Sequence, residues 1–326
     1  MIEQRLTGEN IPFELIPTGK ALDTFFFARD LDFDKYSLLV AAGGDGTYHE
    51  VVNGMLARDD KKKIPIGLIP NGSGNDLCTS LGFKTLDEAL DYIVNREVTK
   101  VDTVRVLIDH ENEESLPEDI NERVMFCRHM MINSALAFPA KIANEAIPWK
   151  ACCGKASYTI ATLIEAIKCG VQPDHFNIFI DGVLQKMDTK NDVQTILFML
   201  FNGKNTGAGM ILNPFAVMND GLLDATWLHD ENKMGVLGIA DLLDKAAKKG
   251  GVQTYENVVT HVRGKQIRIE FTGSDRKKPT GGFGQQLIGI DGEDLRFNNY
   301  VIYDAMPGNV EFLFDSASFF RPADKN

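Results

Sequence analysis

Several features that would assign the chain to a common class are scarce or absent. No apolar run among the 326 residues approaches the ~20 residues that span a bilayer. No internal repeat and no low-complexity tract is found. Basic residues number 34 against 46 acidic ones, which gives a net charge of −12. This balance argues against nucleic acid as a partner and against electrostatic adhesion to anionic membranes, so any membrane contact should be local and apolar.

Cysteine is also scarce. The five cysteines are odd in number, lack zinc-ligand spacing and include the adjacent pair Cys152 and Cys153. Neighbours in sequence rarely bridge each other, so we expect reduced thiols and an intracellular protein. Residues 1–5 show neither a signal-peptide nor a transit-peptide pattern. Cytoplasm and membrane periphery both remain open, as does an organelle if the chain is truncated at its start.

Two glycine-rich loops stand out, each directly after a short apolar stretch typical of a buried parallel strand. The first follows the predicted strand 38–42 and precedes the predicted helix 48–56. It consists of Gly43, Gly44, Asp45, Gly46 and Thr47. Glycines let the backbone approach a ligand, and the helix start directs its N–H groups and positive dipole end at the loop. The pattern predicts a phosphate site, and the neighbouring carboxylate of Asp45 implies Mg²⁺.

The second loop follows the predicted strand 64–70 and opens a short predicted helix, 77–81. It consists of Asn71, Gly72, Ser73, Gly74, Asn75 and Asp76. Its hydroxyl and amide side chains could bind phosphate or ribose. One glycine loop alone could be a tight turn without a ligand, whereas two at the carboxyl ends of parallel strands fit a ligand crevice.

The pattern of predicted elements changes along the chain. A strand at 11–18, a helix at 21–31 and the two strand–loop–helix units predict a parallel sheet with helices on both sides. Thr85 is the predicted N-cap of a further helix, with Glu88 completing a capping box. Later segments mostly read as strands, at 98–108, 124–134, 176–180, 195–202, 223–228, 266–271 and 287–290, and helices are predicted at 156–169 and 233–248. We therefore predict an α/β nucleotide-binding domain, residues 1–103, and a mainly antiparallel β domain, residues 104–309.

The two loops and two downstream segments together resemble the diacylglycerol kinase catalytic domain family, which includes sphingosine and ceramide kinases. The downstream segments are 219–224 and 291–293. The resemblance implies an NAD kinase/diacylglycerol kinase-like fold in which residues 310–326 pack back on the first domain. It also implies an ATP- and Mg²⁺-dependent lipid kinase that meets its lipid substrate at a membrane surface. Diacylglycerol is the favoured acceptor because Asn75 and Asp76 end the second loop.

The resemblance also assigns roles to individual residues. Glu293 would be the catalytic proton acceptor, and Asp45 would help to organise the metal. ATP would contact Thr18, the segment from Gly44 through Thr47 to Glu50, and Ser73. A structural magnesium would be held by the Asp220 side chain and by the backbone carbonyls of Val217 and Leu222. From the residues alone, Asp220-Gly221 and Asp291-Gly292 could each be an ordinary hairpin turn, and His49 is expected to be a helix-face residue.

Two departures from the family keep other functions open. The family begins with an additional strand and loop, whereas the strand predicted at 11–18 matches its second; truncation, a rearranged sheet or a partner that fills the gap would each explain this. Ala137, Phe138, Pro139 and Ala140 stand where the family has Gly-Phe-Asp-Ala. The alternative is a weak or inactive family member that acts as a structural subunit of a homodimer or larger assembly. NAD kinase ranks behind both because the second loop lacks an Asn-Thr-Asp motif.

Overall fold

The computed structural model describes residues 1–137, 139–141, 173–185, 192–207, 209–228, 258–274 and 286–319, with isolated positions at 145, 148, 238, 241, 242, 245 and 251. The predicted helix 156–169, most of the predicted helix 233–248, the glycine-rich stretch 281–284 and Phe138 lie outside the described residues. None of the helices in the described ranges combines the length and apolar character needed to cross a bilayer.

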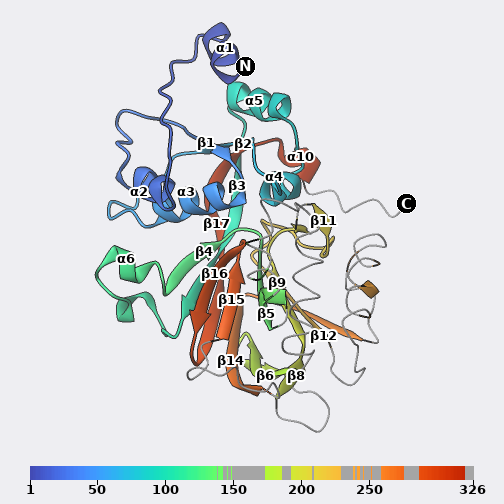
Figure 1. Cartoon of the computed structure of the whole chain (residues 1–326). Helices are drawn as coiled ribbons and strands as arrows, with labels where there is room; N and C mark the ends of the chain where they lie inside the picture. Colours follow the sequence, from blue (N-terminus) through green and yellow to red (C-terminus); the bar gives the residue numbers. More distant parts are fainter. Residues whose placement is uncertain are drawn as a thin grey trace.

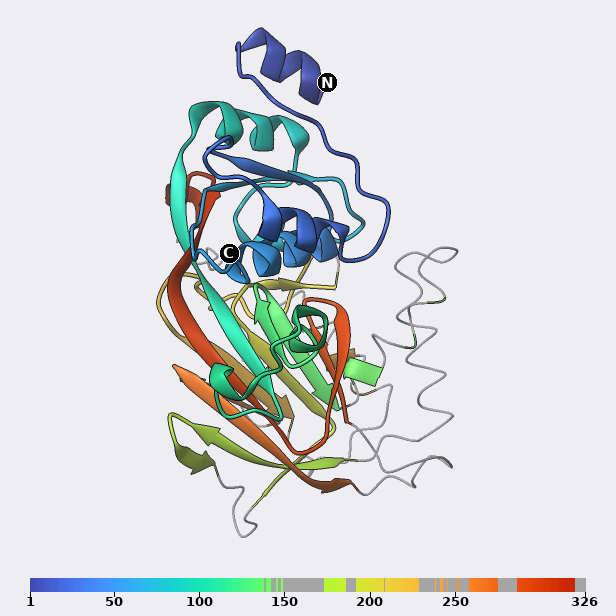
Figure 2. The same ribbon diagram turned by 90° about the vertical axis from the view of Figure 1, so that its left-hand side faces the viewer.

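The N-terminal part is an α/β unit built on two parallel strands, β1 (Leu39–Gly43) and β2 (Ile66–Pro70) (Figure 1). Its helices are α1 (Ile2–Gly8), α2 (Asp23–Asp30), α3 (Asp45–Leu56), α4 (Asp76–Ser80) and α5 (Leu86–Asn95). Figure 2 shows α3 and α5 on opposite sides of the two strands. The predicted capping box of α5 is confirmed, since the Thr85 side chain accepts a bond from the Glu88 N–H and the Glu88 carboxylate accepts one from the Thr85 N–H.

The rest of the described chain forms two mainly antiparallel sheets. The larger contains β3 (Val98–Ile108), β4 (Cys127–Met130), β6 (Asp174–Ile180), β7 (Val183–Gln185), β8 (Val193–Thr195), β14 (Gln266–Ser274) and β17 (Tyr300–Leu313), and it continues into β1 and β2. The smaller has the order β13 (Val259–Gly264), β12 (Leu223–Leu228), β9 (Leu197–Phe201), β5 (Asn133–Ala137), β15 (Gln286–Ile290), β16 (Glu293–Phe297). Shorter elements are η1 (Glu113–Ser115), α6 (Ile120–Arg123), β10 (Asn205–Thr206), β11 (Met210–Ile211) and α10 (Ser316–Phe319).

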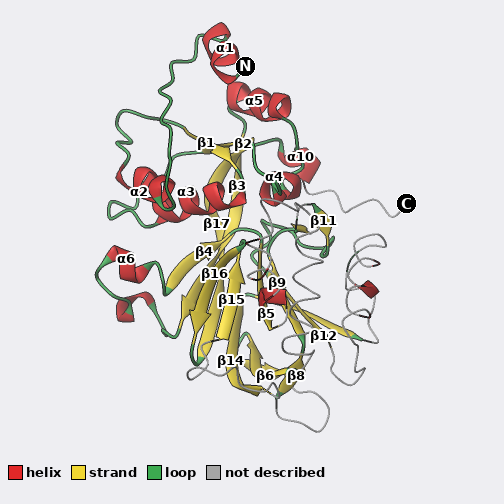
Figure 3. Ribbon diagram, in the orientation of Figure 1, coloured by secondary structure: helices red, strands yellow, loops and turns green. Residues whose placement is uncertain are grey.

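The two sheets pack face to face around one apolar core. Side chains alternate between buried and partly exposed along β6, where Phe176, Ile178 and Ile180 face inward. Ala225 and Trp227 contribute from the smaller sheet. This period of two is what places one face of each strand in the core. Figure 3 shows most helices at one end of the molecule and strands through the rest, which confirms the predicted class of an α/β part followed by a mainly antiparallel β part.

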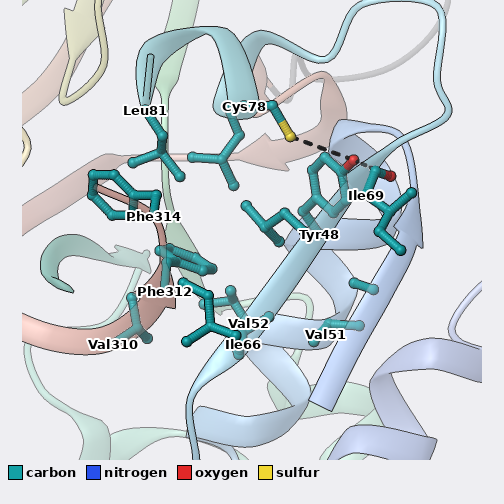
Figure 4. Packing of buried hydrophobic residues seen from close by; sticks show 14 of the residues in the cluster. Tyr48, Val51, Val52, Ile66, Ile69, Cys78, Leu81, Val310, Phe312 and Phe314 are labelled. Atoms are coloured by element: carbon teal, nitrogen blue, oxygen red, sulfur yellow. Dashed lines mark hydrogen bonds between the residues drawn. The ribbon is translucent and has the colours of Figure 1, made fainter. Parts of the chain in front are cut away.

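Strand β17 joins the two parts of the molecule. Most of its length pairs antiparallel with β3 and β14, but Phe312 pairs in parallel with Ile66 of β2. Val310, Phe312 and Phe314 are buried in the core beneath α3, beside Val52 (Figure 4). The sandwich therefore has a covalent and hydrogen-bonded continuation into the α/β unit.

The strand predicted at 11–18 is wrong. This segment has no strand partner, and Phe13, Leu15 and Ile16 are 44%, 67% and 38% exposed. An extended segment becomes a strand only where a neighbour accepts and donates its backbone hydrogen bonds. In the described structure β1 pairs on one side only, with β2, and ends the sheet.

Two other predicted strands are each divided. The segment 124–134 becomes β4 and β5, because the N–H groups of Met131 and Ile132 bind the Asp291 carboxylate instead of a neighbouring strand. The segment 195–202 becomes the end of β8 and β9, because the Thr195 hydroxyl accepts a bond from the Leu197 N–H and interrupts the ladder. Side chains thus decide both breaks.

Ala137 generates a stability prediction. Its φ of 61° lies in the left-handed region, where a Cβ is unfavourable by roughly 1–2 kcal/mol. We expect Ala137→Gly to raise the free energy of unfolding by about 0.5–1 kcal/mol, after allowing for the greater entropy of glycine in the unfolded chain. Urea denaturation measures the change.

The matched control is Ala135→Gly in the same strand, which has ordinary backbone geometry. Glycine there should lower stability by about 0.5–1 kcal/mol. If both substitutions changed the free energy of unfolding in the same direction, the backbone at Ala137 would not be strained.

Candidate active site

The two glycine loops are in backbone contact with each other. A Cβ built at Gly72 would lie 2.4 Å from the Cα of Gly44, and one built at Gly44 would lie 3.0 Å from the Cα of Gly72. The Asn71 N–H donates to the Gly43 carbonyl at 2.8 Å. The structure thus brings the predicted loops together at the carboxyl ends of β1 and β2, where an α/β sheet forms its ligand crevice.

Side chains around the loops hold them in place. The Tyr48 hydroxyl lies 2.8 Å from the carbonyl oxygens of both Gly43 and Ile69, which fixes the ends of β1 and β2. Asn75, at φ 54°, accepts a bond from the Gly72 N–H and donates to the Gly72 carbonyl, both at 2.9 Å. The sequence did not point to Tyr48, since a buried aromatic side chain on a helix usually signals only core packing.

Asp45 connects the first loop to the helix that follows the second. Its Oδ1 accepts a bond from the Leu77 N–H at 3.0 Å, at the start of α4. Burial raises the pKa of Asp45, the charge of Asp291 adds to this, and the backbone N–H groups of Leu77 and Asp76 oppose it. The carboxylate is therefore a structural link between the loops as well as a candidate ligand.

The start of α3 is open to an anion. Its N-cap is Gly44, which has no side chain that could cap the helix. A Cβ at Gly43 would lie 2.4 Å from the Thr47 hydroxyl oxygen, so only glycine fits there. Backbone N–H groups at the positive end of a 12-residue helix favour phosphate.

Glu293 reaches this helix start from the other part of the chain. Asp291 and Gly292, at φ 50° and 89°, form a two-residue turn between β15 and β16, and Glu293 is the first residue of β16. Its Oε1 lies 3.3 Å from the Cβ position of Gly46. Asp291-Gly292 is thus a hairpin turn, and that turn delivers an exposed carboxylate to the first loop.

The Asp291 side chain anchors this turn to the start of β5 and to α3. Its buried carboxylate accepts bonds from the N–H groups of Met131, Ile132 and Asn133, at 2.7–3.2 Å, and lies 3.0 Å from Nδ1 of His49 on α3. The His49 and Asp291 side chains are both 1% exposed. His49 lies on a helix face, as expected, and this buried face of α3 meets the turn that carries Glu293. No local signal reveals this, because the two residues are 242 positions apart.

The remaining predicted nucleotide contacts differ in their surroundings. Ser73 is exposed beside Gly74 in the second loop. The Glu50 carboxylate accepts bonds from the Leu22 N–H, at 2.8 Å, and from the Thr24 hydroxyl, so it anchors the start of α2. Thr18 is exposed on the segment before α2 and makes no hydrogen bond within the described structure.

The two predicted metal positions differ in the groups that surround their carboxylates. No group of three or more His, Cys, Asp or Glu side chains in the described ranges could hold a metal by itself. A Mg²⁺ at the glycine loops would therefore share the Asp45 carboxylate with phosphate oxygens, as this ion commonly does. At the other position, Asp220 Oδ1 accepts from the Leu222 N–H and Oδ2 pairs with Arg263. Each oxygen keeps a further lone pair, so a magnesium ion held by Asp220 with the Val217 and Leu222 carbonyls stays a prediction.

Comparisons with known proteins identify both parts of the chain. The model of the diacylglycerol kinase catalytic domain matches residues 1–106, and the model of the YegS C-terminal NAD kinase beta sandwich-like domain matches residues 136–312, more than half of the chain. A protein named "Probable lipid kinase YegS-like" from Yersinia enterocolitica is 28% identical over 242 residues, 72% of this chain and 71% of that protein. Its counterpart from Enterobacter sp. is 29% identical over 188 residues, 57% of this chain and 54% of that protein.

Two further similarities differ in how much of each chain they cover. Sphingosine kinase 1 of Arabidopsis thaliana is 44% identical over 75 residues, 22% of this chain and 16% of that protein. The crystal structure of a diacylglycerol kinase from Bacillus anthracis has a TM-score of 0.65 at 20% identity, and the match covers 96% of this chain and 89% of that one. The chain therefore matches about half the length of one of the YegS-like relatives and nearly all of a solved structure with the same fold.

The contact between the loops generates a prediction. Gly72→Ala places a methyl group 2.4 Å from the Cα of Gly44, and the backbone atoms there have no rotamer with which to avoid it. We expect a loss of about 1–3 kcal/mol in the free energy of unfolding, measured by urea denaturation. Gly8→Ala, where a Cβ meets nothing within 4 Å, is the control. Equal effects of the two substitutions would show that the loops are not in contact.

The buried carboxyl of Asp45 generates a second prediction. A pKa raised in the folded state means that the folded protein favours the protonated carboxyl, so stability is lost as the pH rises through the folded-state pKa. We expect Asp45→Asn, which is always neutral, to raise the melting temperature at pH 7 and to weaken its pH dependence between pH 4 and 7. Asp59→Asn, at an exposed turn, is the control and should change neither. A lower melting temperature for Asp45→Asn would contradict the burial argument.

Proposed function

Because the chain belongs to the diacylglycerol kinase catalytic domain family, a family of lipid kinases, we propose that it transfers the γ-phosphate of ATP to a lipid hydroxyl. Diacylglycerol at a membrane surface is the proposed acceptor. The observation that carries the proposal is the position of Glu293 Oε1, 3.3 Å from the Cβ position of Gly46 in a phosphate-type loop. A base and a phosphate cradle in contact are the two parts that phosphoryl transfer requires.

The residues divide the reaction between them. The open start of α3 and the backbone of the two glycine loops bind the phosphates of ATP. The lipid hydroxyl oxygen bonds to the γ-phosphorus, its proton passes to the Glu293 carboxylate, and the bond from the γ-phosphorus to the bridging oxygen of ADP breaks. Mg²⁺ beside Asp45 would supply charge neutralisation at the phosphates. Asp291 and His49 position Glu293 through the hairpin turn.

The experiment is transfer of labelled γ-phosphate from ATP to a panel of diacylglycerol, sphingosine, ceramide and NAD. We expect labelled phosphatidate from the wild type. Loss of the base in Glu293→Gln should lower the rate by about 10²–10⁴-fold, and Asp45→Ala should also abolish most transfer because the loop link is lost. Glu122→Gln, on the exposed part of α6, is the charge-matched control and should retain wild-type rates.

Each other result points to a different function. Labelled NAD phosphate would indicate an NAD kinase, and a labelled sphingolipid would replace diacylglycerol as the acceptor. No transfer from a folded protein would favour a structural subunit, a function that Pro139 in the family motif already favours. Full activity of Glu293→Gln would exclude Glu293 as the base.

A further inference from the structure

Arg128 is a buried cation that the proposed chemistry leaves without a role. It lies on β4, opposite Val106 of β3, and is 8% exposed. Its Nε is buried and has no hydrogen-bond partner within the described structure. The described residues also provide no ion pair for its guanidinium. A buried charge that is neither paired nor fully hydrogen-bonded is unfavourable unless something else occupies the space beside it.

Two carboxylates act on Arg128, Glu293 at the start of β16 and Glu50 on α3. Burial lowers the pKa of the Arg128 guanidinium, and the charges of Glu293 and Glu50 oppose this. Glu293 contacts the Cβ position of Gly46, and Glu50 lies one turn further along α3. The guanidinium is therefore close enough to Glu293 and Glu50 for their charges to act on it.

Two sets of hydrogen bonds hold β4 in place. Asn53 of α3 donates to the His129 carbonyl and accepts from the His129 N–H, at 2.9 and 2.7 Å. Directly after β4, the N–H group of Met131 donates to Asp291, in the turn that delivers Glu293. Arg128 thus stands on a strand held both to the phosphate-binding helix and to the turn of the base. Figure 1 shows β4 beneath α3.

We propose that Arg128 binds the γ-phosphate of ATP, the group that is transferred. The inference rests on the proposed function, since it requires ATP at the glycine loops. A phosphate beside Glu293 would supply the anion that the guanidinium lacks, and the planar guanidinium can bind two phosphate oxygens at once. Arg128 gains and loses no proton during transfer; it stabilises the charge on the γ-phosphate oxygens while the bond to ADP breaks.

The test is the affinity for nucleotide, measured by calorimetry with MgATP and MgADP on the whole chain. Because ADP lacks the γ-phosphate, Arg128→Met should weaken MgATP binding by roughly tenfold or more and leave MgADP binding within about twofold. Methionine keeps the apolar stem and removes a buried unpaired charge, so the melting temperature without nucleotide should stay unchanged or rise. Arg123→Met, at an arginine paired with Glu113, is the control and should leave the affinity for both nucleotides unchanged.

Every outcome decides the proposal. Equal losses for MgATP and MgADP, or no loss for either, would overturn it, and equal losses with a lower melting temperature would show a structural role. If Arg128→Met does not fold, Arg128→Lys decides: an ATP-to-ADP affinity ratio reduced at least threefold supports the proposal and an unchanged ratio overturns it. A wild-type protein that binds neither nucleotide would remove the proposed function itself, which is a distinct result.

Discussion

The buried carboxylate of Asp291 holds the two parts of the molecule in register. It accepts bonds from three consecutive backbone N–H groups, at Met131, Ile132 and Asn133, and lies against His49 of α3. A carboxylate so far from water is stable only with this number of donors. The requirement fixes where β4 ends, where β5 begins and how the β15–β16 turn meets the α/β unit. These bonds also determine the position of Glu293, two residues further on.

The glycine loops impose a complementary constraint from the other side. Gly44 and Gly72 approach so closely that no side chain fits between them, which joins the ends of β1 and β2 into one surface. Tyr48 and Asn75 then leave that surface little freedom. Positioned backbone donors need no rearrangement when phosphate binds, which is the arrangement that phosphoryl transfer exploits. Rigidity at the loops and at the Asp291 turn together sets the geometry of the crevice.

The sequence predicted the parts of this site that depend on local chemistry. Glycine after a buried strand indicates a loop, and Asp-Gly indicates a two-residue turn, whatever the rest of the chain does. Both loops and the turn at Asp291 could therefore be located from the residues alone. The strand predicted at 11–18 failed because a strand depends on a neighbour that sequence alternation cannot supply. The prediction of one continuous strand at 124–134 failed for a related reason. The residue that interrupts it, Asp291, is some 160 positions away. The positions of His49 and Arg128 also depend on such long-range contacts.

The distribution of charge explains how an acidic chain can present an anion site. Four carboxylates converge near the start of α3, and three of them are engaged by the protein itself. Asp291 is bound by backbone N–H groups, Glu50 by Leu22 and Thr24, and Asp45 by Leu77. Hydrogen bonds of this kind spread the negative charge over the backbone, so these three repel phosphate less than free carboxylates would. Glu293 is the exposed member of the four, and it is the one that a hydroxyl can reach and that can accept a proton.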